Sequence, residues 1–337
     1  MHIFSIVGPT AVGKSAVALA VGELLLAQGI VTGVDLISAD SRQVYQGLEI
    51  LSGADVPEGS TWVEADAEHD YPYVTLRQHG ISLHGVALIQ PTQEWSLAHF
   101  HQLAHRVIAS AQQKNRAVIV VGGTGLYQTQ LLQASIAGHA PPDEVVRERA
   151  EGMSVVELQE WLGSVDQAVL TALNDSDRAN PRRLVRAIER SLWSQTAPET
   201  ESATQPVKHA QHFLGLQTSK EDLASRIQQR VIQRLERGVV NEVTLLEARL
   251  EEQGAPLARV PARSACGLRE VLALASGDID RPQCIEMWTQ RELSYAKRQA
   301  TWWKKYPQVS WFSIEEPGWQ ERLFALVLEK VASPISH

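Results

Sequence analysis

The strongest constraint on the fold is the segment 8–15, which reads Gly-Pro-Thr-Ala-Val-Gly-Lys-Ser. It fits the phosphate-binding pattern G-x-x-x-x-G-K-[ST]. The apolar run 3–7 ahead of it is typical of a buried strand, and the proline-free segment 14–28 behind it predicts a helix. In this context the loop predicts a polyphosphate ligand held by backbone N–H groups and a helix N-terminus. We expect the following residues at that anion: Gly8, Thr10, Ala11, Val12, Gly13, Lys14 and Ser15.

Length and composition indicate an ordinary globular protein. The 337 residues suffice for one large domain and a smaller one, with 44% hydrophobic and 21% charged residues. No apolar run approaches the ~20 residues of a membrane span, and no signal peptide is recognised, so we expect no membrane association. Cys266 and Cys284 form neither a disulfide framework nor a C-x-x-C pair, which favours a cytoplasmic location. The net charge of −8 mildly disfavours a nucleic-acid partner, although charge distribution matters more.

Two further predicted strands end in polar or glycine-rich segments. The strand 35–39 precedes Asp40, a candidate base or metal ligand; the alternative is a helix N-cap, and both stay open. The strand 117–121 precedes two glycines and Thr124, whose hydroxyl we expect in the same crevice as Asp40 and Lys14. The second strand lacks the acidic residue with which NTPases hold magnesium, which disfavours a plain ATPase.

The segments outside these motifs contain fewer candidate functional residues. Residues 52–73 are typical of a surface loop or lid, and residues 83–89 are a further candidate strand. The segment 96–111 has helical spacing, and we interpret its three histidines as a solvated face rather than a metal site. Residues 138–208 predict a helical, strandless insertion, with one helix starting at Asn180-Pro181 and a linker over 194–208. A strand over 212–216 then returns to the first domain.

Two C-terminal helices carry basic stripes. Arg226, Arg230, Arg234 and Arg237 share one helix face, which indicates an anion role for at least one of them or, alternatively, a solvated face with local acidic partners. On the helix 283–305, basic and aromatic residues alternate along one side, and Arg298 belongs to this stripe. Such interleaving favours RNA over a plain surface. We expect Trp303, on the opposite side, in the core.

Five motifs in collinear order resemble those of the tRNA dimethylallyltransferase (tRNA isopentenyltransferase) family. Residues 8–15 resemble its G-P-T-A-x-G-K-[ST] loop, and residues 37–45 its I-S-x-D-S-x-Q-[VI]-Y segment. Residues 121–127 resemble V-G-G-T-G-L-Y, residues 182–189 the R-x-x-R-A-[LI]-E helix, and residues 295–302 the Y-A-K-R-Q-x-T-W motif. Other P-loop enzymes such as kinases share only the first motif.

The resemblance implies a fold and a reaction. The fold is α/β, a P-loop NTPase-like parallel sheet flanked by helices with an all-helical insertion domain; we expect a core over 1–137, the insertion over 138–208 and a return to the core over 209–337. The reaction transfers a dimethylallyl group from dimethylallyl diphosphate to the exocyclic N6 of the adenosine 3′ to the anticodon in tRNA. Diphosphate is released, the chain is expected to act as a monomer, and Mg²⁺ is expected at Ser15.

The resemblance also assigns roles to residues. It implies Asp40 as the base that takes a proton from the amine, Thr124 near the reacting centre and Arg230 as a diphosphate-binding arginine. The expected tRNA contacts, including Arg298 from the basic stripe, are Asp40, Ser41, Arg42, Gln43, Arg182, Arg183, Arg186, Ser264, Gly267, Arg269 and Arg298.

Some positions depart from the family pattern. The family often has a G-T-A-K-P segment, but the corresponding run 52–57 of this chain contains no lysine. The family's C-terminal G-Y pair is Gly267-Leu268 in this chain. Two rival enzymes remain: an ATP-binding nucleotide or small-molecule kinase, and a prenyltransferase that acts on free adenine nucleotides. A third, non-enzymatic alternative is a tRNA-binding module without catalysis, which the presence of Lys14, Asp40 and Thr124 disfavours.

Overall fold

The computed structural model describes residues 1–54, 56–57, 59–65, 71–76, 80–132, 143–196 and 209–334. Contacts divide the chain into two compact units: unit 1, Met1–Leu132 with Lys208–His337, and unit 2, Gln133–Val207. The domain boundaries expected at 137–138 and 208 lie outside the described residues. None of the described helices is long and apolar enough to cross a lipid bilayer.

Unit 1 is built on an eight-stranded sheet of order β3-β4-β5-β2-β6-β1-β7-β8. All neighbouring strands pair in parallel except β3–β4 and β4–β5, which are antiparallel. The predicted α/β fold with a mainly parallel sheet is confirmed. The strands are β1 His2–Val7, β2 Gly33–Ser38, β3 Thr61–Val63, β4 Tyr73–Thr75, β5 Ile81–His84, β6 Arg116–Val121, β7 Ala210–Gln217 and β8 Ser310–Ser313.

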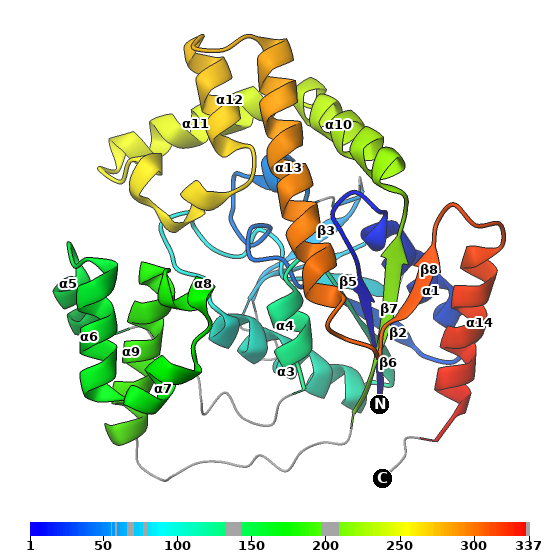
Figure 1. Cartoon of the computed structure of the whole chain (residues 1–337). Helices are drawn as coiled ribbons and strands as arrows, with labels where there is room; N and C mark the ends of the chain where they lie inside the picture. The colour runs from blue at the N-terminus through cyan, green and yellow to red at the C-terminus, as the bar shows by residue number, and fades with distance from the viewer. Residues whose placement is uncertain are drawn as a thin grey trace. The chain divides into compact units, whose positions relative to one another are not determined.

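Helices flank this sheet (Figure 1). They include the predicted helices over 14–28, 96–111 and 283–305, each confirmed to within two residues. The helices of unit 1 are α1 Lys14–Ala27, α2 Glu49–Ser52, α3 Leu97–Gln113, α4 Gly125–Gln130, α10 Lys220–Glu236, α11 Val239–Glu252, α12 Leu268–Ser276, α13 Arg281–Trp303 and α14 Trp319–Ala332, with 3₁₀ turns η1 Leu257–Arg259 and η2 Pro261–Ser264.

The edge of the sheet differs from prediction. The described part of 52–73 is not simply a loop or lid, because it contains β3 and the first residue of β4. These strands have three residues each and are rich in β-branched and aromatic side chains, too short for periodicity to reveal. The candidate strand 83–89 was placed too far along the chain. It ends at His84 because Gly85 has φ +88°, where an added Cβ would lie 2.9 Å from the Ser38 carbonyl oxygen.

Unit 2 is helical throughout its described residues 143–196, as predicted. Its largest helix begins at Pro181, where the Asn180 side chain accepts a bond of 3.3 Å from the Arg183 N–H, and it runs past the expected end to Thr196. Val146, Leu158, Leu162 and Ile188 are among the side chains of its own small core. The helices are α5 Glu144–Ala150, α6 Val155–Val165, α7 Gln167–Ala172, α8 Asp175–Arg178 and α9 Pro181–Thr196.

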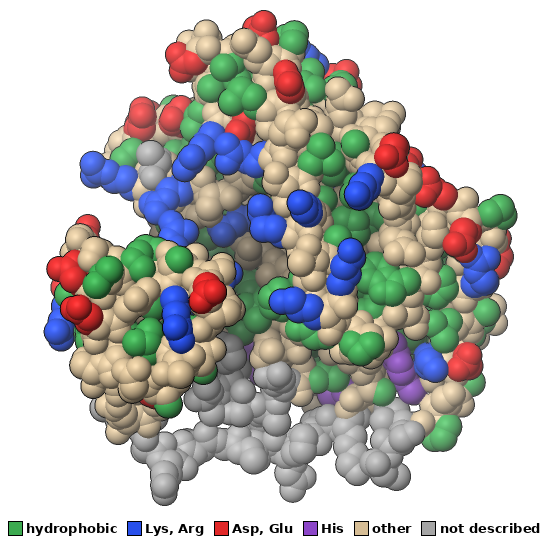
Figure 2. Space-filling model, viewed as in Figure 1, with side chains coloured by type: hydrophobic (Ala, Val, Ile, Leu, Met, Phe, Trp, Pro, Cys, Tyr) green, Lys and Arg blue, Asp and Glu red, His purple; other side chains and the backbone are tan. Residues whose placement is uncertain are grey.

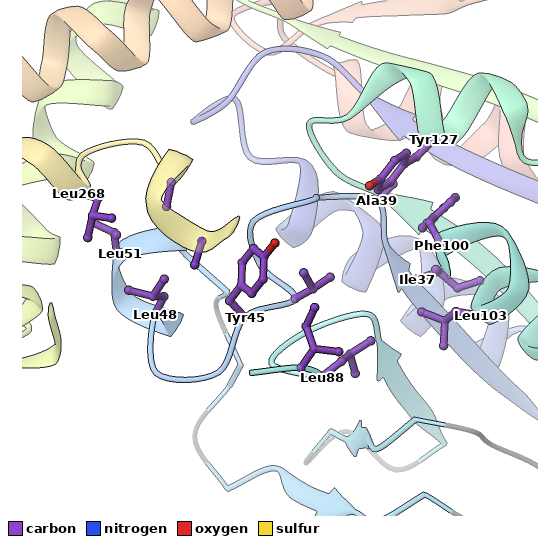
Figure 3. Close-up of a cluster of buried hydrophobic side chains, with 14 of the residues drawn as sticks. Ile37, Ala39, Tyr45, Leu48, Leu51, Leu88, Phe100, Leu103, Tyr127 and Leu268 are labelled. Carbon is purple, nitrogen blue, oxygen red and sulfur yellow. The ribbon is translucent and has the colours of Figure 1, made fainter. Parts of the chain in front are cut away.

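A large apolar cluster of unit 1 anchors the segment that follows β2. Tyr45, Leu48 and Leu51 are each at most 2% exposed, and they share this cluster with Ile37 of β2 and Leu268 of α12 (Figure 3). Burial of such side chains contributes roughly 1.5–3 kcal/mol each. The polar residues 40–43 are therefore held between a buried strand and a buried anchor, which limits their freedom.

Candidate active site

Three sequence motifs meet at one edge of the sheet because their strands are neighbours. The phosphate-binding loop follows β1, Asp40 follows β2 and the loop 122–124 follows β6, and the sheet order places β2, β6 and β1 side by side. In a parallel sheet the carboxyl ends of adjacent strands lie together. Two backbone bonds tie the second and third motifs: Ala39 N–H to the Val121 oxygen at 2.7 Å, and Thr124 N–H to the Ala39 oxygen at 2.9 Å.

The phosphate-binding loop has the backbone that its glycines predict. Gly8 has φ +134°, and an added Cβ would lie 2.4 Å from the Leu216 carbonyl oxygen, so only glycine fits there. Gly13 has φ +93° and caps α1. Ala11 also has positive φ, +63°, at a cost of roughly 1–2 kcal/mol for a non-glycine residue. Such local strain is typical of functional sites.

A cavity of about 450 Å³, here called the loop cavity, opens over this loop. Its lining is in part polar, with Lys14, Ser15 and Gln43, and in part apolar, with residues of α1 and of the neighbouring strands and their ends. Its lining residues include Thr10, Ala11, Gly13, Lys14, Ser15, Leu19, Leu36, Ser38, Asp40, Gln43, Leu76, Leu83, Val86, Val121, Gly122, Gly123, Arg230 and Gln299.

A second cavity of about 430 Å³, here called the arginine cavity, adjoins the first. Thr10, Asp40 and Arg230 line both, so the two cavities meet at these three residues. Basic side chains gather on the face of unit 1 around α13 and beside α12 (Figure 2). The second cavity is lined by seven arginines, among other residues: Arg42, Arg230, Arg234, Arg263, Arg269, Arg291 and Arg298.

Asp40 sits at the junction as a partly buried carboxylate with few fixed partners. Its Oδ1 accepts a bond of 2.9 Å from the Arg42 N–H, which closes a turn. No helix starts at Asp40, so it is not a helix N-cap, which was one of the two roles that the sequence left open. Burial raises the pKa of Asp40 above its ordinary value, although the Arg42 N–H and the charge of Lys14 oppose the rise. A carboxyl group with a raised pKa is suited to accepting a proton near neutral pH.

Lys14 and Arg230 face the same space as two cationic groups. Burial, and secondly the charge of Arg230, lower the pKa of Lys14 to about 7. The Lys14 Nζ donates to the Pro9 carbonyl oxygen at 2.6 Å, and the Arg230 guanidinium donates to the Thr10 hydroxyl at 2.6 Å. When Lys14 is protonated, its charge and that of Arg230 together attract an anion strongly. Neighbouring Arg234 is instead paired with Glu292 at 2.9 Å, and both are buried.

Thr124 lies beside Asp40 but lines neither cavity. It precedes α4, and its Oγ1 accepts a bond of 3.3 Å from the Ser41 N–H. This contact braces the turn that carries Asp40. Gly8 and Val12 also line neither cavity, and Val12 packs in the core at 2% exposure. The other predicted anion-binding residues of the loop and Arg230 line the loop cavity.

The comparisons with known proteins are consistent across the chain. A family model described as "IPP transferase" matches residues 74–306, which is more than half of the sequence. The chain belongs to the IPP transferase family. A tRNA dimethylallyltransferase of Thermomicrobium roseum is 32% identical over 95% of this chain and 89% of its own length. A tRNA dimethylallyltransferase of Anoxybacillus flavithermus is 30% identical over 94% of this chain and 92% of its own length.

Solved structures of tRNA-modifying transferases have a fold similar to that of this chain. The crystal structure of a tRNA delta(2)-isopentenylpyrophosphate transferase from Staphylococcus epidermidis has a TM-score of 0.62 at 25% identity, covering 98% of this chain and 99% of that one. A eukaryotic dimethylallyltransferase acting on tRNA has a TM-score of 0.73 at 20% identity, covering 100% of this chain and 81% of that one. The latter likeness concerns the fold.

The residues predicted to contact tRNA are distributed unevenly in this IPP transferase. Of those in unit 1, Gln43 lines the loop cavity, and Asp40 lines both cavities. Gly267 lines neither; it caps α12 with φ +90°, and an added Cβ would lie 2.1 Å from the Trp288 ring. The residues that line the arginine cavity are Asp40, Ser41, Arg42, Ser264, Arg269 and Arg298.

Two of the three predicted tRNA-contacting arginines of unit 2 make ion pairs within that unit. Arg186 donates to Glu189 at 2.6 Å, and Arg147 donates to the other oxygen of the same carboxylate at 2.9 Å. Glu189 is 2% exposed. Arg183 pairs with Asp177. These ion pairs fix the positions of Arg183 and Arg186 on α9.

Sequence reasoning missed the buried polar residues of α13. Glu292, Ala296, Gln299 and Trp303 form a buried face at helical spacing, and Trp303 is in the core as predicted. Gln299 bonds to both the phosphate-binding loop and the loop 122–124. The sequence did contain a signal for these residues, because Glu292 and Gln299 are polar residues at core positions of an amphipathic helix. Buried polar groups require hydrogen-bond partners, so such positions indicate a specific contact.

The histidines of α3 are held by local contacts. His99 caps the helix by bonding with Ser96, and the His105 Nε2 lies 2.8 Å from the Leu131 carbonyl oxygen. Among the described residues, no three His, Cys, Asp or Glu side chains gather as a metal site.

Proposed function

We propose that the chain transfers the dimethylallyl group of dimethylallyl diphosphate to the exocyclic N6 of the adenosine 3′ to the anticodon in tRNA, and releases diphosphate. The observation that carries this proposal is the junction of two cavities at Asp40, Thr10 and Arg230. One cavity offers an anion cradle and apolar lining residues, and the other is lined by many arginines. A prenyl diphosphate matches the first in chemistry, and a nucleotide of an RNA chain matches the second.

The loop cavity serves the donor. Lys14, Arg230 and the N-terminus of α1 would bind the diphosphate and stabilise the charge that develops on its bridging oxygen as the carbon–oxygen bond breaks. The apolar lining residues, among them Leu36, Leu83 and Val121, suit the five-carbon group. No phosphoryl group moves, which accounts for a phosphate-binding loop without the acidic residue typical of ATP-hydrolysing enzymes.

Asp40 serves the acceptor. The adenine amine is a weak nucleophile because its lone pair is delocalised into the ring. As the new bond between N6 and the allylic carbon forms, Asp40 would take a proton from N6, and the electron pair of the breaking bond would leave with the diphosphate. Thr124 would act through the Ser41 N–H, holding the turn that aims the carboxylate.

Magnesium fits as an ion brought with the diphosphate. Ser15 lines the loop cavity next to Lys14, and Mg²⁺ prefers oxygen ligands from one or two protein groups, phosphates and water. Bound there, the ion would add positive charge at the leaving group. Ser15 would orient it through its hydroxyl.

The arginine cavity serves the tRNA. We propose that Ser41, Arg42, Ser264, Arg269 and Arg298 contact the RNA next to the target base, which leaves its stack to reach Asp40. Arg182, Arg183 and Arg186 of unit 2, and the backbone at Gly267, are further proposed RNA contacts. Since the acceptor is a tRNA, we place the reaction in the cytoplasm. One chain supplies every residue invoked, as a monomer requires.

A transfer assay tests the proposal. Purified chain, Mg²⁺, labelled dimethylallyl diphosphate and unmodified tRNA should give label in precipitated RNA. AMP in place of tRNA should give none, whereas a free-nucleotide prenyltransferase would label it. In a parallel reaction with added ATP, a kinase would release ADP. Labelled RNA without ATP consumption is the expected result, and ATP consumption without labelled RNA would contradict the proposal.

A further inference from the structure

The Gln299 side chain joins two loops that belong to different strands. Its Oε1 accepts a bond of 2.7 Å from the Thr10 N–H in the phosphate-binding loop. Its Nε2 donates a bond of 3.0 Å to the Gly123 carbonyl oxygen, in the loop after β6. One partner is a donor and the other an acceptor, and the side-chain amide in this orientation satisfies both.

This link is buried and closely fitted. Gln299 is 5% exposed, and a buried amide is costly unless its groups are paired. An added Cβ on Gly123 would lie 2.2 Å from the Gln299 Nε2, 2.8 Å from the Tyr295 hydroxyl and 3.2 Å from the Asp40 Oδ2. Gln299, Tyr295 and Asp40 therefore converge on the same glycine, and the absence of a side chain there is what allows the approach.

Gln299 also lies close to both sets of reacting groups. Thr10 is one of the residues shared by the two cavities, and it accepts the Arg230 hydrogen bond. Gly123 precedes Thr124, whose hydroxyl accepts the Ser41 N–H next to Asp40. The chain of contacts runs from the Arg230 cradle through Thr10, Gln299 and the 122–124 loop to the Asp40 turn. The four hydrogen bonds along this path measure 2.6, 2.7, 3.0 and 3.3 Å.

We propose that Gln299 is a positioning residue for group transfer, which fixes the distance between the diphosphate cradle and the Asp40 turn. The inference rests on the proposed function and adds a residue to it. Gln299 itself touches neither the proton nor the bond that breaks. Misplacement of reacting groups by about 1 Å costs on the order of 100-fold in rate, so loss of the link should slow transfer. The phosphate-binding loop keeps its own anion contacts, so donor binding should change little.

The test compares three variants in single-turnover assays with saturating excess protein. The single-turnover rate constant is used because it does not depend on what fraction of the protein is folded. Gln299→Met has similar volume and makes neither bond; Gln299→Glu keeps the acceptor for Thr10 and, when ionised, loses the donor to Gly123. The matched control is Gln211→Met. Gln211 Nε2 donates to the Ser5 hydroxyl at 2.7 Å and to the Gln128 backbone carbonyl oxygen at 2.9 Å, and Gln211 lines neither cavity.

We expect Gln299→Met to lower the single-turnover rate roughly 10- to 100-fold, with KM for donor and tRNA within about threefold of the original. Gln299→Glu should also be slower than the original chain, and Gln211→Met should keep the original rate. The inference is overturned if both Gln299 variants transfer at the original rate, if they slow it no more than Gln211→Met, or if the loss is entirely in KM. Should Gln299→Met not fold, Gln299→Glu decides alone. If the original chain transfers nothing, the proposed function itself fails, which is a separate result.

Discussion

The Arg230 guanidinium donates a hydrogen bond of 2.6 Å to the Thr10 hydroxyl, across 220 positions of sequence. This bond fixes α10 against the phosphate-binding loop and holds a second cation beside Lys14. Arg230 is four residues from Arg226 and four from Arg234, yet its neighbours are engaged elsewhere: Arg226 pairs with Asp222, and Arg234 with Glu292. Among these three, Arg230 is the arginine directed to the anion cradle.

Arg230→Ala should therefore impair transfer strongly. Removal of one preorganised group that stabilises a developing anion typically costs 10²- to 10³-fold, and we expect about 100-fold in kcat/KM for the prenyl diphosphate. The control is Arg226→Ala on the same helix, whose carboxylate partner is exposed enough that the pair contributes little. Similar losses in both variants would show that general positive charge, rather than this hydrogen-bonded arginine, binds the donor.

Asp40→Asn should keep tRNA binding and lose most turnover. A positioned base typically contributes 10²- to 10⁴-fold, and asparagine has the same shape but cannot take the proton. In the original chain the rate should rise as pH rises through the raised pKa of Asp40, since only the ionised carboxylate accepts a proton. Single-turnover rates across pH check both points. An unchanged rate in the variant would exclude Asp40 as the base.

Donor binding should be coupled to proton uptake at Lys14. In the empty cavity the Lys14 pKa is lowered to about 7, chiefly by burial, so above that pH the amine is largely neutral. A bound diphosphate favours the charged form and raises the pKa, so binding takes up a proton above pH 7 and affinity falls as pH rises. Calorimetry in buffers of different ionisation enthalpy measures the uptake. The same measurement on Lys14→Met gives the proton uptake that comes from the ligand alone. Equal proton uptake by the original chain and by Lys14→Met would contradict the assignment of the uptake to Lys14.

Gly267→Ala should destabilise unit 1. The substitution places a non-glycine residue at φ +90° and drives its Cβ into the Trp288 ring, with an expected total of about 2–5 kcal/mol from backbone strain and overpacking. Gly277→Ala, at the other end of α12, is the matched control because φ is +81° and nothing lies within 4 Å of the added atom. Denaturant unfolding compares the two. Equal losses would mean that the Trp288 contact contributes nothing.

The fold was predictable where local signals were strong. β1 and β6 are mainly apolar, and the glycine loop before α1 can adopt few backbone conformations, so local sequence specifies them. β3 and β4 were missed because three residues carry no measurable period, and their strand conformation comes from pairing with β5 and each other.

The candidate site was predictable in part for the same reason. Asp40 and Lys14 follow predicted strands of one parallel sheet, so topology alone brings them close. The partners of Thr10 could not be read locally, since Arg230 and Gln299 are more than 200 residues away and reach it only through tertiary packing. The arginines that line the arginine cavity come from the turn after β2, α10, the 3₁₀ turn η2, α12 and α13, which no single-helix pattern contains.

The most direct measurement is mass analysis of nucleosides from an unmodified tRNA, digested after incubation with the chain, dimethylallyl diphosphate and Mg²⁺. We expect one adenosine per tRNA to be heavier by a single five-carbon dimethylallyl unit, located 3′ to the anticodon, and we expect no such change with Asp40→Asn. Adenosine left unmodified by folded protein that binds both substrates would contradict it.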